Sequence, residues 1–142
     1  MPTNDLLERN RLILCHFDSY STDLRFVRIN STVLLPAPLP ENAQMCAAPT
    51  GTGDLPAEVL QAALEKLGMD SSQVVLDDAF QAWLSADTTS VQVHLARFTT
   101  FEAPHDAVAH HGGVFKPISE LRGLPMAELI LLRQVFTLIM GA

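Results

Sequence analysis

The segment between residues 104 and 113 brings together four side chains that could bind a metal ion. It reads P-H-D-A-V-A-H-H-G-G and contains His105, Asp106, His110 and His111. Imidazole nitrogens and carboxylate oxygens are common metal ligands, and His105 and His110 are separated by little more than one helical turn. No cysteine stands nearby, however, and the spacing matches no zinc pattern. These four residues are candidate ligands for a divalent metal, with a polar surface loop as the favoured alternative.

A second set of candidates consists of glutamates on a predicted helix. Glu65 is followed directly by Lys66, and Glu58 stands seven residues earlier on the same helical face. At the rise of an α-helix that separation is about 10 Å, so the two carboxylates cannot chelate one ion. A hard cation such as Mg²⁺ needs several oxygen ligands close together. Glu65 is therefore a weak catalytic candidate, and a solvated surface residue is the favoured interpretation.

Three further residues are candidates for contacts with a ligand. Gly51 and Gly53, in the run G-T-G, would let the backbone approach a phosphate, although a flexible loop before a helix is the plainer interpretation. Trp83 could stack on a base, with core packing as its alternative. His16 and His94 fall in predicted strands, and we expect them to be ordinary sheet residues rather than ligands or bases.

The glutamates belong to the most regular segment of the chain, which runs from Asp54 to Met69 and reads D-L-P-A-E-V-L-Q-A-A-L-E-K-L-G-M. Asp54 is a suitable N-cap, Pro56 fits the first turn, and Gly68 suits a left-handed C-terminal cap. Between these ends, apolar side chains recur at helical spacing, namely Val59, Leu60, Ala63, Leu64 and Leu67. The sequence therefore predicts an amphipathic helix that packs on a sheet.

Apolar or alternating runs between turn residues predict the strands around this helix. We expect strands at residues 11–17, 24–35, 73–84, 91–101 and 114–116, with an interruption of the second one near residues 30–31. Residues 36–53 form either one long connection or two loops around a short strand at 44–47, and a role in closing over a site is open. A helical turn at 117–121 and a last helix from 123 to about 140 complete the chain.

This order of elements resembles that of the Nudix hydrolases. The resemblance covers roughly Thr50 to Ala142 and depends on a helix ending in A-A-L-E-K-L-G-M, the strand from Val74 to Trp83, and G-G-V-F-K-P-I-S-E-L before a closing helix. It implies one Nudix-like domain over residues 1–142, with residues 1–10 as an N-terminal arm or short helical turn. The implied fold is of the α/β (α+β) class, an α/β/α sandwich around a mixed, mainly antiparallel sheet.

The same resemblance implies that the usual chemistry of the family is missing. Its signature, G-x5-E-x7-R-E-U-x-E-E-x-G-U with U aliphatic, supplies glutamates that bind Mg²⁺ on a diphosphate substrate. When Gly68 and Met69 are aligned with the last two positions, Glu65 is the only glutamate that survives. The arginine and the other glutamates are replaced by Gln61, Ala62, Lys66 and Gly53.

Composition and charge narrow the classes of function. A chain of 142 residues with 48% hydrophobic and 18% charged residues is typical of one globular domain. The net charge of −7 disfavours binding to nucleic acid or to an anionic membrane surface. The N-terminal residues are polar and form no secretion signal, and the apolar run at 129–140 is too short to cross a bilayer. We therefore expect a cytoplasmic protein in which Cys15 and Cys46 are reduced and mostly buried.

The last predicted helix is apolar nearly all round. Between residues 129 and 140 only Arg133, Gln134 and Thr137 are polar. Such a helix must be covered on more than one side. We therefore predict a homodimer through this C-terminal helix, with loops of the same chain as the alternative cover.

Three hypotheses about function follow from these observations. The first is a Nudix-like domain that binds a small molecule, such as a nucleotide-like ligand, or a protein partner without catalysing hydrolysis. The second is a hydrolase of nucleotide-type diphosphates that uses Mg²⁺ or another divalent metal, held by Glu65 with His105, Asp106, His110 or His111. The third is a structural dimerisation domain.

Overall fold

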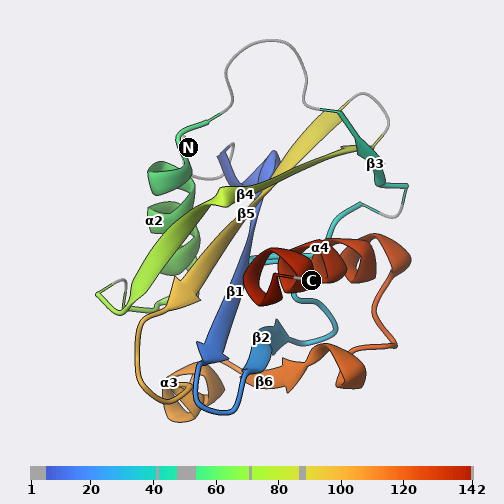
Figure 1. The fold of residues 1–142 in the computed structure, drawn as a ribbon. Helices are drawn as coiled ribbons and strands as arrows, with labels where there is room; N and C mark the ends of the chain where they lie inside the picture. The colour runs from blue at the N-terminus through green and yellow to red at the C-terminus, as the bar shows by residue number, and fades with distance from the viewer. Residues whose placement is uncertain (1–5, 41, 48–53, 71, 87–88, 142) are drawn as a thin grey trace.

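The computed structural model describes residues 6–40, 42–47, 54–70, 72–86 and 89–141, and these form a twisted sheet between helices (Figure 1). The neighbours in the sheet follow the order β3-β4-β5-β1-β2-β6. β1 and β5 run parallel, and the other neighbours are antiparallel. The prediction of a mixed, mainly antiparallel sheet is therefore confirmed. The strands are β1 (Asn10–Asp18), β2 (Asp23–Ile29), β3 (Gln44–Cys46), β4 (Val74–Ala86), β5 (Thr89–Phe98) and β6 (Gly113–Pro117).

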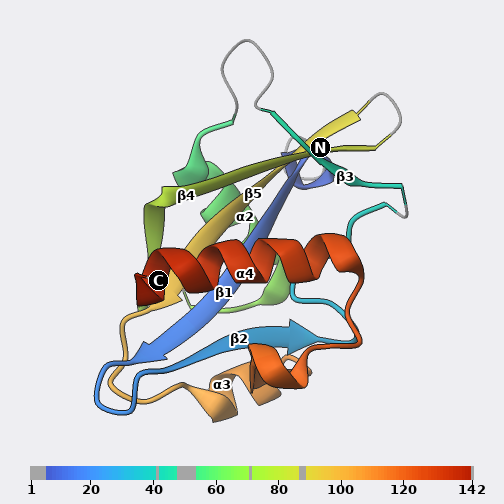
Figure 2. The ribbon, with the colours of Figure 1, turned by 45° about the vertical axis from the view of Figure 1, so that its right-hand side comes forward.

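Helices cover both faces of this sheet, which confirms the predicted α+β class. α2 (Pro56–Leu67) lies on one face, and α4 (Met126–Met140) crosses the other, as Figures 1 and 2 show together. Two short helical segments contact β6, namely α3 (His105–Ala109) and the 3₁₀ turn η1 (Ile118–Glu120). Residues 6–8 are also helical and lead into β1.

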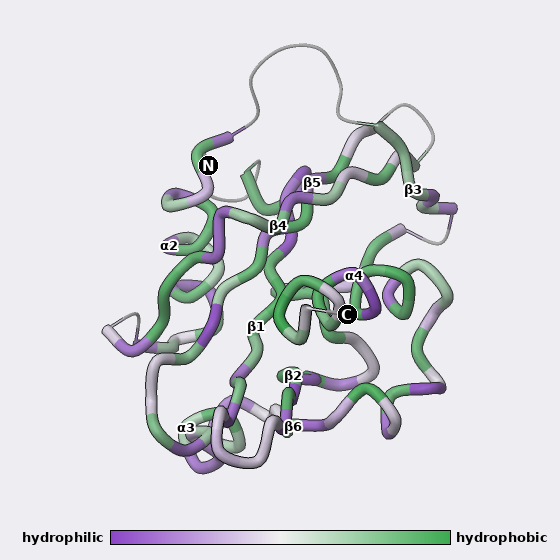
Figure 3. The backbone as a smooth tube through the Cα atoms, in the orientation of Figure 1, coloured by the Kyte–Doolittle hydropathy of each residue, from purple (hydrophilic) through white to green (hydrophobic). Residues whose placement is uncertain are grey.

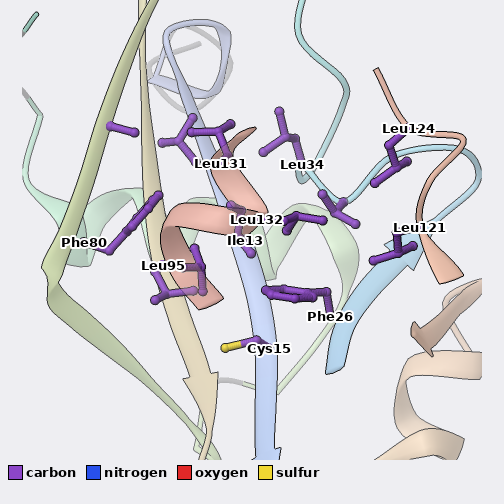
Figure 4. Close-up of a cluster of buried hydrophobic side chains, with 14 of the residues drawn as sticks. Ile13, Cys15, Phe26, Leu34, Phe80, Leu95, Leu121, Leu124, Leu131 and Leu132 are labelled. Atoms are coloured by element: carbon purple, nitrogen blue, oxygen red, sulfur yellow. The ribbon is translucent and has the colours of Figure 1, made fainter. Parts of the chain in front are cut away.

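The central strand β1 supplies side chains to two hydrophobic cores, one on each face of the sheet. Ile13 and Cys15 belong to the core that α4 covers (Figure 4), whereas Leu12 and Leu14 belong to the core that α2 covers. All four side chains are fully buried. A strand with helices on both sides has no face in water, so it appears in the sequence as a continuous apolar run. Each such side chain contributes about 1.5–3 kcal/mol through burial.

A buried carboxylate joins α4 to the chain that follows β2. Glu128 accepts hydrogen bonds from the Thr32 hydroxyl at 2.9 Å on both carboxylate oxygens and from the backbone N–H of Val33 at 3.0 Å. The Thr32 oxygen itself accepts a bond from the N–H of Leu34. Burial raises the pKa of the Glu128 carboxyl, and the bonds from Val33 and Thr32 partly oppose that rise. This contact fixes the start of α4 over the sheet.

The second strand is shorter than predicted. β2 ends at Ile29, because Asn30 has a φ of 57° and reverses the chain, so that Ile29 pairs with Thr32. The apolar residues that follow are buried, and Leu35 returns to β1, where it bridges Leu12. The predicted interruption near residues 30–31 is therefore confirmed, whereas the prediction that the strand continues to Leu35 is wrong. The apolar run reflects a buried crossing segment rather than a sheet ladder.

α4 is hydrophobic along much of its length (Figure 3), but it is not buried all round. Leu131, Leu132 and Val135 face the core, whereas Phe136 and Leu138 are 37% and 39% exposed. Within the described residues, no helix is long and apolar enough to span a membrane. The packing of α4 on the sheet therefore accounts for one of its apolar sides and leaves the outer sides uncovered.

Candidate functional site

A cleft of about 470 Å³ lies along the exposed side of α2, between that helix and the segment that leads into β1. It is referred to below as the α2 cleft. Its apolar wall is formed by Leu6, Ala57 and Ala62, and its polar wall by Arg9, Asp54, Glu58, Gln61 and Glu65. Glu65, the weak catalytic candidate of the sequence, therefore lines a cavity of a size that is typical of small-molecule sites.

An ion pair closes one end of the α2 cleft. Arg9 donates from Nε to Asp54 Oδ2 at 2.8 Å and from Nη2 to Oδ1 at 3.0 Å, a two-point contact between guanidinium and carboxylate. Asn10 also donates to Asp54 Oδ2, at 2.7 Å. These hydrogen bonds, from Arg9 first, lower the pKa of the Asp54 carboxyl below its usual value. Asp54 is therefore ionised at neutral pH, and its hydrogen bonds hold the N-terminal end of α2 against the start of β1.

The hydrogen bonds continue from Asp54 into the sheet. The side chain of Asn10 donates to Asp54 and to the carbonyl of Leu6, so its Oδ1 is left as an acceptor for Nε2 of His94 at 2.9 Å. This assigns the proton of a neutral His94 to Nε2. Burial lowers the pKa of the His94 imidazole, and Asp54 raises it to a smaller extent. His94 lies in β5, as predicted. Its hydrogen-bonded link to Asp54 through Asn10 was not predicted.

The role predicted for Asp54 as the N-cap of α2 is wrong. Leu55 occupies that position, with φ −68° and ψ 126°, and no side chain caps the helix. The carboxylate of Asp54 is bound to Arg9 and Asn10 instead. The C-terminal prediction is confirmed, because Gly68 has a φ of 75° and its N–H bonds to the carbonyl of Glu65.

The α2 cleft does not fit Mg²⁺, the metal ion of the family that the sequence resembles. Glu65 and Glu58 are both exposed, and Glu65 accepts a hydrogen bond of 2.9 Å from Gln61. Ala62, at the position of a family glutamate, is buried and has no oxygen to offer. Within the described residues, no group of three or more His, Cys, Asp or Glu side chains is placed to hold a metal ion. No step that involves a metal follows from this arrangement.

The predicted histidine ligands lie at a different place, a second cleft of about 490 Å³ between the end of α2 and α3. Asp106, His110 and His111 line it, together with Asp70. Residues 105–109 form a helix rather than the expected loop, and this turns His105 away to pack edge-on against Phe115. A metal at these residues stays a prediction, and the described side chains give it no geometric support.

His111 packs closely against the end of α2. A Cβ atom built on Gly68 would lie 3.3 Å from Cε1 of His111. Glycine is therefore favoured at position 68 by the positive φ and by this close approach. His110 and His111 line one cleft and Glu65 lines the other, with no lining residue in common. The hypothesis that they act together around one metal therefore finds no shared cavity in the described residues.

Of the remaining candidate ligand residues that the structure describes, Trp83 lines neither of these two clefts. Gly51 and Gly53 lie outside the described residues. Trp83 is half-buried in β4 and lines a smaller cleft of about 320 Å³ with Cys46 and Gln134.

The two cysteines are both free. Cys15 is buried, and burial raises the pKa of its thiol to about 12, so it is unreactive at neutral pH. Cys46 is exposed. The prediction of mostly buried thiols is therefore confirmed for Cys15 alone.

Comparison with protein-family models finds no match, and comparison with curated proteins finds none either.

Proposed function

We propose that the protein is a non-catalytic, Nudix-like domain that binds a small molecule in the α2 cleft. The observation that carries this proposal is the cleft itself, about 470 Å³ in volume, with Glu65 on its wall and no carboxylate at the neighbouring position Ala62. The bonds among Arg9, Asn10 and Asp54 hold one end of the cleft in a fixed shape. Such pre-organisation lowers the entropic cost of ligand binding.

The charges of the cleft favour a particular class of ligand. Arg9 compensates the charge of Asp54, whereas neither Glu58 nor Glu65 forms an ion pair with any described residue. A bare diphosphate would be repelled by these two carboxylates, since like charges that meet at a binding surface are costly. A ligand with cationic or hydrogen-bond donor groups, such as an amine or the base of a nucleoside, fits better.

Assays of hydrolysis and of binding test this proposal together. With Mg²⁺ and a panel of nucleoside diphosphate derivatives, we expect no turnover above the protein-free control, in wild type or in Glu65→Gln. In thermal-shift titrations with amines and nucleosides, we expect at least one compound to stabilise the wild type. The double variant Glu58→Gln/Glu65→Gln should bind that compound about tenfold more weakly, the loss typical of a charged hydrogen bond.

Glu102→Gln is a matched control, because Glu102 is exposed and lies outside the α2 cleft. It should bind like the wild type. Turnover that disappears in Glu65→Gln would overturn the proposal and favour the metal-dependent hydrolase. Metal analysis separates that alternative further, since it requires stoichiometric metal that is lost when His110 and His111 are replaced.

A homodimer through α4 is a second, independent proposal. It is favoured by exposed apolar side chains on the outer sides of α4, where Met126 is 65% exposed and Leu138 is 39% exposed. Exposed apolar area of this kind is a common feature of association surfaces. If no ligand stabilises the protein, this contact alone supports the purely structural role.

A further inference from the structure

A groove of about 560 Å³ is lined by residues of α4 and η1 and by Arg122. α4 lies on the face of the sheet opposite α2 (Figure 2). The apolar lining of the groove consists of Ile118, Leu129 and Phe136. Its polar lining consists of Ser119, Thr137 and two arginines, Arg122 and Arg133. An apolar lining with a few polar and charged groups is the usual composition of a site for a small molecule.

The arginines make the groove basic in an acidic protein. The chain has a net charge of −7, yet no Asp or Glu lines this groove. Both guanidinium groups are exposed, and neither forms an ion pair or a hydrogen bond with the residues that the structure describes. Four other cations among the described residues, Arg9, Arg25, Arg97 and Lys116, have carboxylate partners. The donors of Arg122 and Arg133 are therefore available to a ligand.

Phe136 gives the groove an aromatic surface next to these charges. It is 37% exposed, and it follows Arg133 by three positions, so the two side chains lie on the same side of α4. A guanidinium binds carboxylate or phosphate through two parallel hydrogen bonds. An apolar group joined to such an anion would contact Leu129 and Phe136 at the same time.

We propose that this groove binds a small organic anion, a carboxylate or phosphate attached to an apolar group of about the size of a phenyl ring. A second copy of the chain is a poorer occupant, because a two-fold contact through the groove would bring arginines together with no acid to compensate them. The site is separate from the α2 cleft, so it does not depend on the function proposed above.

The test is an NMR titration of the full chain with phenylacetate, phenyl phosphate, the neutral analogue phenylacetamide and inorganic phosphate. We expect saturable shifts of amides in residues 118–122 and 129–137 with one or both of the phenyl anions. Arg133→Gln and Arg122→Gln should each weaken this binding about tenfold or more, as expected for loss of a charged hydrogen bond. The affinity of Arg133→Lys should lie between those of the wild type and Arg133→Gln, because lysine keeps the positive charge but lacks the parallel N–H donors of the guanidinium.

Lys66→Gln provides the control, because it removes the same charge from an exposed position on α2. It should bind the phenyl anions as the wild type does. Several results would overturn the proposal: absence of saturable shifts, equal binding of phenylacetamide, equal binding of inorganic phosphate, or unchanged affinity in both arginine variants. Displacement of the phenyl anions by an acidic peptide that binds far more tightly would also overturn it and would identify a protein-docking groove instead.

Discussion

At the scale of single residues, Glu128 couples stability to pH. Its pKa is raised in the folded protein, so its contribution to the free energy of unfolding is fully present below the unfolded pKa and is lost as pH rises through the folded pKa. Replacing it with Gln removes this titration but keeps an acceptor for the N–H of Val33. We therefore expect the free energy of unfolding of Glu128→Gln, minus that of the wild type, to be larger at pH 7.5 than at pH 4. Urea unfolding of both proteins at the two pH values measures this difference.

Two other variants make this prediction specific. Glu102→Gln, at an exposed glutamate, should show no such change between the two pH values. Glu128→Ala should lose about 1–3 kcal/mol at either pH, because it leaves the N–H of Val33 buried without an acceptor. A relative stability of Glu128→Gln that is the same at both pH values would show that burial does not raise this pKa.

The hydrogen bonds around Asp54 join residues that are far apart in the sequence, so the sequence alone does not predict them. Asp54 was assigned to helix capping because capping depends on the next few residues, which the sequence displays. Its partner Asn10 is 44 residues away, and the step from Asn10 to His94 spans 84 residues. Only the parallel pairing of β1 with β5, which places Asn10 opposite Gln92 near His94, brings these side chains together.

At the scale of elements, α2 begins with a residue that does not cap it. Leu55 has the extended backbone of an N-cap and is 63% exposed, but its side chain offers no acceptor to the first turn. Leu55→Ser should supply that acceptor and raise the free energy of unfolding by roughly 0.5–1 kcal/mol. Thermal and urea unfolding measure the change, with Leu55→Ala as the control that removes the leucine without adding a cap. If the two variants are equally stable, the first turn of α2 does not need a cap.

The other elements differ in how well they could be predicted from the local sequence pattern. The helix from Pro56 to Leu67 was predicted almost residue by residue, because its apolar spacing and its Gly68 terminus are local signals. Residues 33–35 were predicted to be a strand, because a buried crossing segment and a buried strand have the same composition. For residues 105–109, the short helix was missed because five residues carry too little periodicity to distinguish it from a loop.

At the scale of the whole molecule, the fold class was predictable and the site was predictable only in part. Alternation in β5 and the continuous apolar run in β1 indicated a sheet with covered faces, and the structure confirms it. The sequence singled out Glu65 as a weak catalytic candidate, and Glu65 lines the α2 cleft. The sequence could not show that Glu65 and His111 line different clefts, because that separation depends on where α3 packs against the end of α2.

The homodimer proposed through α4 also belongs to this scale. Residues two positions apart on an α-helix are rotated by about 200° around its axis. Leu138 and Phe136 therefore lie on different flanks of α4. We assign the dimer contact to the flank of Leu138. We expect light scattering to give twice the mass of one chain at high protein concentration. The mean mass should decrease towards that of one chain as the protein is diluted. Leu138→Asp should shift this equilibrium to the monomer, because a buried, unpaired carboxylate is costly at an interface.

Val75→Asp is the matched control for that experiment. Val75 is also an exposed apolar residue, 50% exposed in β4, but it is not part of α4. The control should keep the wild-type mass, and Arg133→Gln should keep it too if the groove and the dimer surface are separate. A wild type that is monomeric at all concentrations would contradict the dimer and leave the outer side of α4 open to water. Loss of the dimer in Arg133→Gln would instead place the groove within the interface and tie the two proposals together.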